Sequence, residues 1–343
     1  MRNLMKLLAV LMLVATVSCR RDHLYYASSD TATVLVEPDW TTSGVHPNGV
    51  SVFAFRESDG SLYKRFPPVS ASEKCYVRLP QGDFTLIVMN DTPEEFGGKI
   101  DFTGYDNIST FQARGVRDEG TSSRLREHLA SKAAGDDEEY CIVEPDTLAV
   151  SVIKGVHITP QQIDYWYDRP QGDSQAETAL VVETSPAPVI SKVNITAHVT
   201  GLKYARGTTL SYLRGVAGGH YMGLGENSTD GVAHAFILNN RKFDPGSDSD
   251  GTITASFLSF GLIGDGKSGG RYFLDINFVL INGEPYPLSF DVTDLISIDV
   301  TLSMQLSLNL DLEIELPEVV GKDEGGFNTD INEWEDETVD IPM

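Results

Sequence analysis

The chain has few of the residues that build metal sites and disulfide frameworks. Its 343 residues include three cysteines, and its seven histidines form no H-E-x-x-H motif and no close pair. Zinc sites usually need closely spaced cysteines and histidines, and small secreted scaffolds usually need several disulfides. The sequence favours neither class, and we expect no metal and no cofactor.

Basic residues are also scarce. There are 26 Lys and Arg against 50 Asp and Glu, which gives a formal net charge of −24. A chain this acidic repels phosphate groups. We therefore expect no nucleic-acid partner, and the composition is more consistent with a secreted, solvent-facing surface.

Long apolar runs are missing except near the start. Residues 7–17 are apolar apart from Thr16 and follow Arg2 and Lys6. A spanning helix needs about 20 apolar residues, so this shorter run is typical of a secretory signal. The residues ATVSC, ending at Cys19, resemble a bacterial lipobox, in which residues 1–18 are removed and the cysteine is acylated, for example with palmitate. An ordinary cleaved signal followed by a chance cysteine is the alternative.

Acylation of Cys19 would leave two cysteines, Cys75 and Cys141. In an exported protein these would form either one disulfide that closes a long loop or two separate buried thiols. The sequence leaves both readings open.

The dominant hydrophobic period is two, which predicts strands. Strands are expected at residues 31–37, 50–55, 75–79, 84–90, 147–153, 193–199, 272–280 and 300–316. The runs 50–55 and 84–90 are apolar on both faces, so we expect them to be central. The run 300–316 alternates without a break over roughly 55 Å, and we expect it to bend, to bulge or to serve two sheets.

Helix signals are weak, with one exception. Residues 121–134 read as a short helix, with Ser123 as the cap and with Leu125 and Leu129 on one face. A polar, turn-rich stretch between Arg169 and Pro188 predicts a domain boundary. The connections are too short for repeated helical crossovers. We therefore predict an all-β fold of two consecutive antiparallel β-sandwiches, over residues 19–180 and 181–343.

Catalytic motifs are not convincing. Residues 261–268 match the P-loop pattern G-x-x-x-x-G-K-S, but a strand and not a helix follows them. Residues 244–251 resemble a calcium loop only faintly, because Gly246 and Phe257 stand where acidic ligands belong. No group of base, nucleophile and orienting residue emerges, so we expect no enzyme. A hydrolase with dispersed carboxylates is the weakest hypothesis.

Two aromatic features could bind a ligand. Tyr165, Trp166 and Tyr167 form a dense cluster, and Trp40 lies in a short early segment. Such rings could stack on a sugar or seat another protein, or they could pack between domains. A glycan-binding surface lipoprotein is therefore the alternative to a structural protein.

The C-terminal tail resembles a known family. Gly325-Gly326-Phe327 and Ile331-x-x-Trp334 follow the long alternating run. These residues resemble the C-terminal end of fimbrillin-like lipoproteins of anaerobic Gram-negative bacteria, in or near the type V pilus superfamily. The lipobox at Cys19 is a further point of resemblance to these lipoproteins. The resemblance is spread over most of the chain.

The resemblance implies two transthyretin-like β-sandwiches and a non-enzymatic role as a fimbrial anchor or accessory subunit. It also implies a lipid-anchored protein of the outer membrane, on the cell surface more than on the periplasmic side, that joins other fimbrial subunits by β-strand exchange. Host molecules or glycans are further partner candidates. Stalk subunits of the superfamily are cut after an arginine, and four arginines offer such a position: Arg114, Arg117, Arg124 and Arg126.

Overall fold

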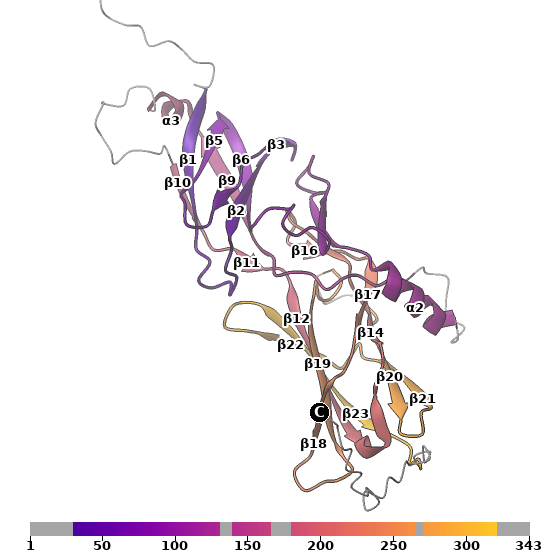
Figure 1. Cartoon of the computed structure of the whole chain (residues 1–343). Coiled ribbons are helices and arrows are strands. Elements are labelled where there is room, and N and C mark those ends of the chain that lie inside the picture. The colour runs from indigo at the N-terminus through magenta and orange to yellow at the C-terminus, as the bar shows by residue number, and fades with distance from the viewer. Residues whose placement is uncertain (1–29, 131–138, 166–179, 265–269, 321–343) are drawn as a thin grey trace, which may run out of the picture.

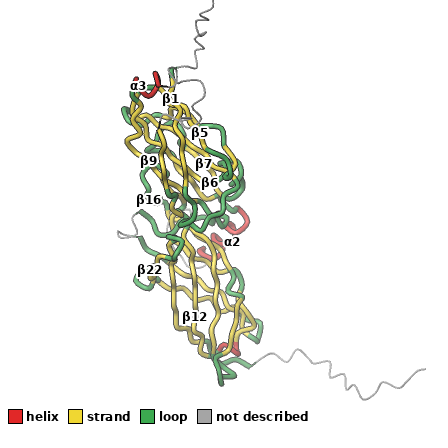
Figure 2. Tube along the Cα trace, turned by 90° about the vertical axis from the view of Figure 1, so that its left-hand side faces the viewer, coloured by secondary structure: helices red, strands yellow, loops and turns green. Residues whose placement is uncertain are grey.

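The computed structural model describes residues 30–130, 139–165, 180–264 and 270–320. The molecule is elongated (Figures 1 and 2). Strands β1–β11 are called the first half below and β12–β23 the second half. Most strands of each half lie at one end, and β16 lies in the middle of the molecule near β11 (Figure 1). The first half contains β1 (Thr31–Pro38), β2 (Gly49–Arg56), β3 (Leu62–Arg65), β4 (Val69–Ser70), β5 (Cys75–Pro80), β6 (Gly82–Asn90), β7 (Ile100–Thr103), β8 (Gln112–Gly115), α2 (Glu119–Ala130), β9 (Ala149–Ile158), α3 (Pro160–Tyr165), β10 (Leu180–Thr184) and β11 (Ala187–Pro188). The second half contains β12 (Ser191–Thr200), β13 (Ala205–Thr208), β14 (Ser211–Ala217), β15 (Gly219–Tyr221), β16 (Glu226–Asn227), β17 (Gly231–Phe236), β18 (Asn240–Phe243), β19 (Gly251–Ser259), β20 (Phe273–Leu280), β21 (Pro285–Asp291), β22 (Ile296–Val300) and β23 (Leu306–Glu315).

The first half is a β-sandwich. A sheet ordered β10-β1-β5 packs on a sheet ordered β11-β9-β6-β2-β3. Val52 and Leu86 belong to the core of this sandwich, whereas their neighbours Phe53 and Ile87 belong to a second core on the other face. The prediction that 50–55 and 84–90 are central strands, buried on both faces, is confirmed.

The second half is also a β-sandwich. One sheet is ordered β18-β19-β12-β23-β22, and the other is ordered β13-β20-β14-β17 with β21 beside β20. In β12 the residues Val193, Ile195, Ala197 and Val199 are buried, as their alternation predicts. Most pairs are antiparallel, but β1 pairs with β10, and β12 with β23, in parallel. The predicted all-β fold of two consecutive sandwiches is confirmed.

The two halves share a sheet. Its strand order is β16-β15-β8-β7, so two strands of each half lie in one ladder. The backbone N–H of Met222 donates to the carbonyl of Phe111 at 2.9 Å, which extends the pairing past β15. One hydrophobic core runs from Phe53 and Phe111 to Leu274 and Leu312. The predicted domain boundary at residue 180 stays a prediction. Strands that precede this boundary pair with strands that follow it, and the two halves share one core.

Helix α2 lies against the second half beside β14 and β17 (Figure 1). Leu125 on this helix is fully buried in a small cluster with Tyr212 and Ala233. The predicted cap is wrong: Ser123 lies inside the helix, and the carboxylate of Asp118 accepts hydrogen bonds from the N–H groups of residues 120 and 121. Residues 131–134 of the predicted helix lie outside the described residues, and the short helix α3 was not predicted.

The predicted strand at 300–316 is confirmed from Leu306 to Glu315, but residue 300 belongs to another strand and the expected bend is a full reversal. The chain reverses at residues 301–305, and β22 and β23 form an antiparallel hairpin in which Val300 is opposite Leu306. Met304 adopts a φ of 59°, and the N–H of Thr301 donates to the carbonyl of Gln305. Val300 and Leu306 are directly opposed in the hairpin, so both side chains lie on the same face of the sheet. Because the two residues are an even number of positions apart, the apolar alternation in the sequence continues through the turn.

Candidate functional site

Several predicted site residues lie outside the described part of the chain. These are Cys19, the tail residues Gly325 to Trp334, and the side chains of the cluster Tyr165, Trp166 and Tyr167. Lipidation of Cys19 therefore stays a prediction.

The disulfide reading is wrong. Cys75 and Cys141 are free and buried. Cys75 belongs to the core of the first sandwich, whereas Cys141 belongs to the separate cluster under α2. Burial raises the pKa of each thiol to about 11, so both are inert, apolar core residues.

The other predicted positions are dispersed. Trp40 is half-buried and packs against the first sandwich core. Of the four arginines proposed for cleavage, Arg114 lies within strand β8 and Arg117 stacks over the ring of Tyr140 at 5.0 Å. Arg124 and Arg126 are exposed on α2. Cleavage at any of them stays a prediction.

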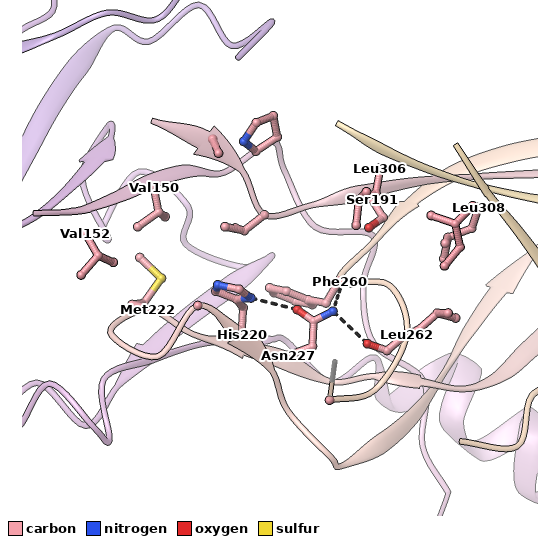
Figure 3. A pocket seen from close by; sticks show the side chains of 16 residues that line it. Val150, Val152, Ser191, His220, Met222, Asn227, Phe260, Leu262, Leu306 and Leu308 are labelled. Carbon is pink, nitrogen blue, oxygen red and sulfur yellow. Dashed lines mark hydrogen bonds between the residues drawn. The ribbon is translucent and has the colours of Figure 1, made fainter. Parts of the chain in front are cut away.

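A pocket lies where the two halves meet. Its cavity volume is about 420 Å³, and its walls come from β9, the segment 187–191, the β15–β16 hairpin, the loop after β19, and the β22–β23 hairpin (Figure 3). We call it the junction pocket. Val150 and Val152 form the first-half wall, and Leu306 and Leu308 face them from the second half. The pocket is therefore built by segments far apart in sequence.

His220 and Asn227 form the polar part of this pocket. The Asn227 amide nitrogen donates to the carbonyls of Phe260 and Leu262 at 2.7 and 2.8 Å. Its oxygen must therefore accept, at 2.8 Å, from Nδ1 of His220. His220 is 7% exposed, and burial lowers its pKa. The ring is thus neutral near pH 7, with the proton on Nδ1 and a free lone pair on Nε2.

The β22–β23 hairpin projects from the side of the molecule beside this pocket (Figure 1). Large apolar side chains are exposed along it: Ile298 (48%), Val300 (65%), Leu302 (106%), Met304 (57%) and Leu306 (42%). Among the described strands, β22 pairs with β23 alone. The hairpin thus presents an open edge and an apolar face together.

A second, shallower pocket lies at the other end of β12. Thr200 lines it, whereas Ser191 at the start of β12 lines the junction pocket. Its volume is about 430 Å³, and Tyr204 and Tyr286 are half-buried in its wall. The Tyr204 hydroxyl donates to Glu318 at 2.8 Å. We call it the tip pocket.

An ionic cluster lies in the second half close to helix α2. Asp275 is fully buried, and its Oδ2 accepts from Nε of Arg214 at 2.8 Å. Nη1 of Arg214 donates to Glu139 at 2.8 Å. The nearby His128 ring of α2 lies 5.6 Å from Tyr212. These contacts join the helix region of the first half to the second sandwich.

Within the described ranges, no three His, Cys, Asp or Glu side chains converge to hold a metal ion. The loop at 244–250 is a turn between β18 and β19, largely exposed to solvent. None of the helices in those ranges is long and apolar enough to cross a membrane.

The sequence did not single out the junction pocket. His220 is one of seven scattered histidines, and Asn227 stands out in the sequence only as part of an N-x-S/T motif. Their pairing follows from the β15–β16 register, in which they are directly opposed. Strand β16 has two residues. Such a short strand shows too little hydrophobic alternation for the sequence to reveal this pairing.

Comparison with known proteins gives a family and a fold. A family model described as "Domain of unknown function (DUF5119)" matches residues 18–236. A comparison with curated proteins finds no match. A candidate adhesin from Bacteroides ovatus is 16% identical, with a TM-score of 0.53, over 84% of this chain and 94% of that one.

Two further solved structures are similar at lower scores. The fimbrial anchor protein Mfa2 from Porphyromonas gingivalis is 14% identical over 82% of this chain and 90% of its own, with a TM-score of 0.46. Another candidate adhesin from Bacteroides ovatus is 11% identical over 82% and 89%, with a TM-score of 0.47. The fold expected from the fimbrillin-like resemblance is confirmed, and because the family model covers more than half of the chain, the chain belongs to the DUF5119 family.

Proposed function

We propose that the protein is a non-enzymatic surface lipoprotein, a structural or adhesion component related to fimbriae that acts as an anchor or accessory subunit. The observation that carries the proposal is the exposed, apolar β22–β23 hairpin with its open edge. Its partners would be other fimbrial subunits.

The hairpin suits strand addition. An incoming strand would bond to the free main-chain groups of β22, and its side chains would cover Ile298 and Val300. An apolar edge left uncovered is an aggregation hazard that proteins normally block with charges or a covering element. On β22 the charged residue is Asp299, which accepts a hydrogen bond from the Asn309 amide of the same hairpin, and Ile298 and Val300 stay exposed beside it. This exposed apolar edge supports a role in assembly.

The direction of the chain supports anchoring through Cys19. Gly44 follows β1 in the chain and lies close to Ser303 of the hairpin. A β-carbon added to Gly44 would be 2.7 Å from the Ser303 side chain. Strand β1 therefore runs toward the junction and begins at the far end of the first half. A lipid at Cys19 would hold that end at the outer membrane and direct the second half away from it, onto the cell surface.

Metabolic labelling tests the anchor. Cells grown with labelled palmitate should yield labelled protein in the outer-membrane fraction, and a Cys19→Ala variant should lose both the label and the membrane association. A wild-type protein without label would contradict the lipoprotein assignment.

Charge substitutions test the assembly. Lysine at an edge blocks strand pairing, so Ile298→Lys combined with Val300→Lys should remove the protein from crosslinked surface assemblies in intact cells. Val181→Lys is the matched control, because Val181 is 48% exposed on β10 in the first half. Equal crosslinking of all three proteins would refute the role of the hairpin.

Glycan binding is a second candidate, favoured by the tip pocket. Two tyrosine rings and the carboxylates of Glu315 and Glu318 line one recess, which is a combination that can stack on and hydrogen-bond a sugar. A glycan array should show binding that Tyr204→Ala and Tyr286→Ala abolish and that Tyr76→Ala on β5 preserves. No binding by the wild type would exclude this candidate.

A further inference from the structure

The junction pocket has no charged lining. The chain has 50 acidic and 26 basic residues, yet none of the 16 residues that line this pocket is Asp, Glu, Lys or Arg. Most of the wall residues are aliphatic, and Met222 and Phe260 add to the apolar lining. A charged ligand would lose its hydration here without gaining a partner, so the pocket selects an uncharged one.

Two polar atoms face this apolar space. His220 lies between Asn227 and Met222, with Nδ1 toward Asn227 and the opposite edge of the ring toward the pocket (Figure 3). Across the described chain, the structure gives its Nε2 no hydrogen-bond partner. The Ser191 hydroxyl, on a residue that is 3% exposed, also lies in the wall.

The His220 ring is held as an acceptor. Asn227 uses its amide nitrogen on two carbonyls and its oxygen on Nδ1 of His220. The proton is thus kept on Nδ1, and Nε2 can only accept. Nε2 is therefore the acceptor that this recess offers to a ligand with an O–H or N–H group.

We propose that the junction pocket binds a small, uncharged and mainly apolar molecule whose hydroxyl or amide group donates a hydrogen bond to Nε2 of His220. The cavity volume of about 420 Å³ lies at the lower end of the range for small-molecule sites. A strand that adds to the edge of β22 would lie along its main chain and would leave these two polar atoms in the recess. Ile298 and Leu306 belong to both the hairpin and the pocket lining, so the two sites adjoin. The ligand test uses the isolated protein and the assembly test uses intact cells, so either proposal can fail without the other.

The test compares two isomers, n-octanol and methyl heptyl ether, of which only the alcohol can donate. The intact protein carries methyl-labelled methionine, and a Met222→Leu variant identifies the Met222 signal. Octanol should shift that signal with an affinity about fivefold higher than that of the ether, the effect of one hydrogen bond. Equal affinities, or no shift with either compound, would overturn the proposal.

A variant pair assigns the acceptor. In His220→Asn, the new amide can still donate to Asn227 but has no acceptor at the Nε2 position. The preference for octanol over the ether should disappear in this variant and persist in His198→Asn, which changes an exposed histidine on β12. The readout is the ratio of the octanol affinity to the ether affinity within each protein. A general loss of stability would lower both affinities together and would leave this ratio unchanged. A preference retained in His220→Asn would overturn the assignment to Nε2.

Discussion

His220 and Asn227 are directly opposed on β15 and β16, with 2.8 Å between Nδ1 of the histidine and Oδ1 of the asparagine. The same asparagine bonds two carbonyls of the loop after β19. One side chain therefore holds the ring orientation and the shape of the pocket wall together.

Asn227→Ala should destabilise the fold. The change leaves buried donors and acceptors unpaired, at about 1–3 kcal/mol each. We expect the free energy of unfolding, measured with urea, to fall by about 3 kcal/mol. Asn240→Ala is the control, because the Asn240 side chain bonds once on an exposed strand. Equal losses in the two variants would contradict the account.

Acidification should weaken the fold through His234. Burial lowers the pKa of this side chain to about 4, whereas the unfolded chain takes up the proton near pH 6.5. The unfolded state therefore binds more protons between these values, and the stability present above pH 6.5 is lost as the pH falls.

The expected loss from this histidine is about 2 kcal/mol between about pH 7 and about pH 5. His234→Phe, beside the ring of Phe257, removes the titrating group and should flatten the unfolding free energy over that range. An unchanged pH slope in the variant would contradict the assignment.

Gly219→Ala should weaken the join between the halves. A β-carbon there would lie 2.5 Å from the carbonyl oxygen of Ala113, across the β8–β15 pairing. Because backbone must move to relieve the clash, we expect a loss of about 2 kcal/mol and a lower Tm. Gly207→Ala meets no atom within 4 Å and should leave the Tm nearly unchanged, so similar shifts would argue against the clash.

Asp275→Asn should cost more than the same change at Asp291. Both carboxylates pair with an arginine, but Asp275 is fully buried against Arg214 and Asp291 is exposed beside Arg271. Breaking a buried pair costs about 3 kcal/mol, and breaking an exposed pair costs less than about 1 kcal/mol. Denaturation at neutral pH measures both, and a smaller loss at Asp275 would contradict the prediction.

Local periodicity was enough to predict most of the strands. In β12 and β20 the alternation is regular, because each strand has one face on the core. In β2 and β6 the continuous apolar pattern revealed burial on both faces. The sequence could also suggest two sandwiches, since a polar stretch separates the two groups of strands.

Long-range pairing and unusual turns could not be predicted in this way. The reversal at residues 301–305 has the sequence TLSMQ, without the Gly, Pro, Asn or Asp that mark most turns. The shared sheet joins residues over a hundred positions apart, and no local pattern reports such a contact. The junction pocket depends on both features and was therefore not predicted.

The chain crosses between the halves more than once. Strand β15 pairs with β8 of the first half, while Cys141 bridges to Ala233 of the second. A pull along the molecule therefore cannot simply straighten a single linker. It must shear a strand ladder and open a shared core at the same moment, so the two halves bear tension as one stiff rod and do not act as a hinge.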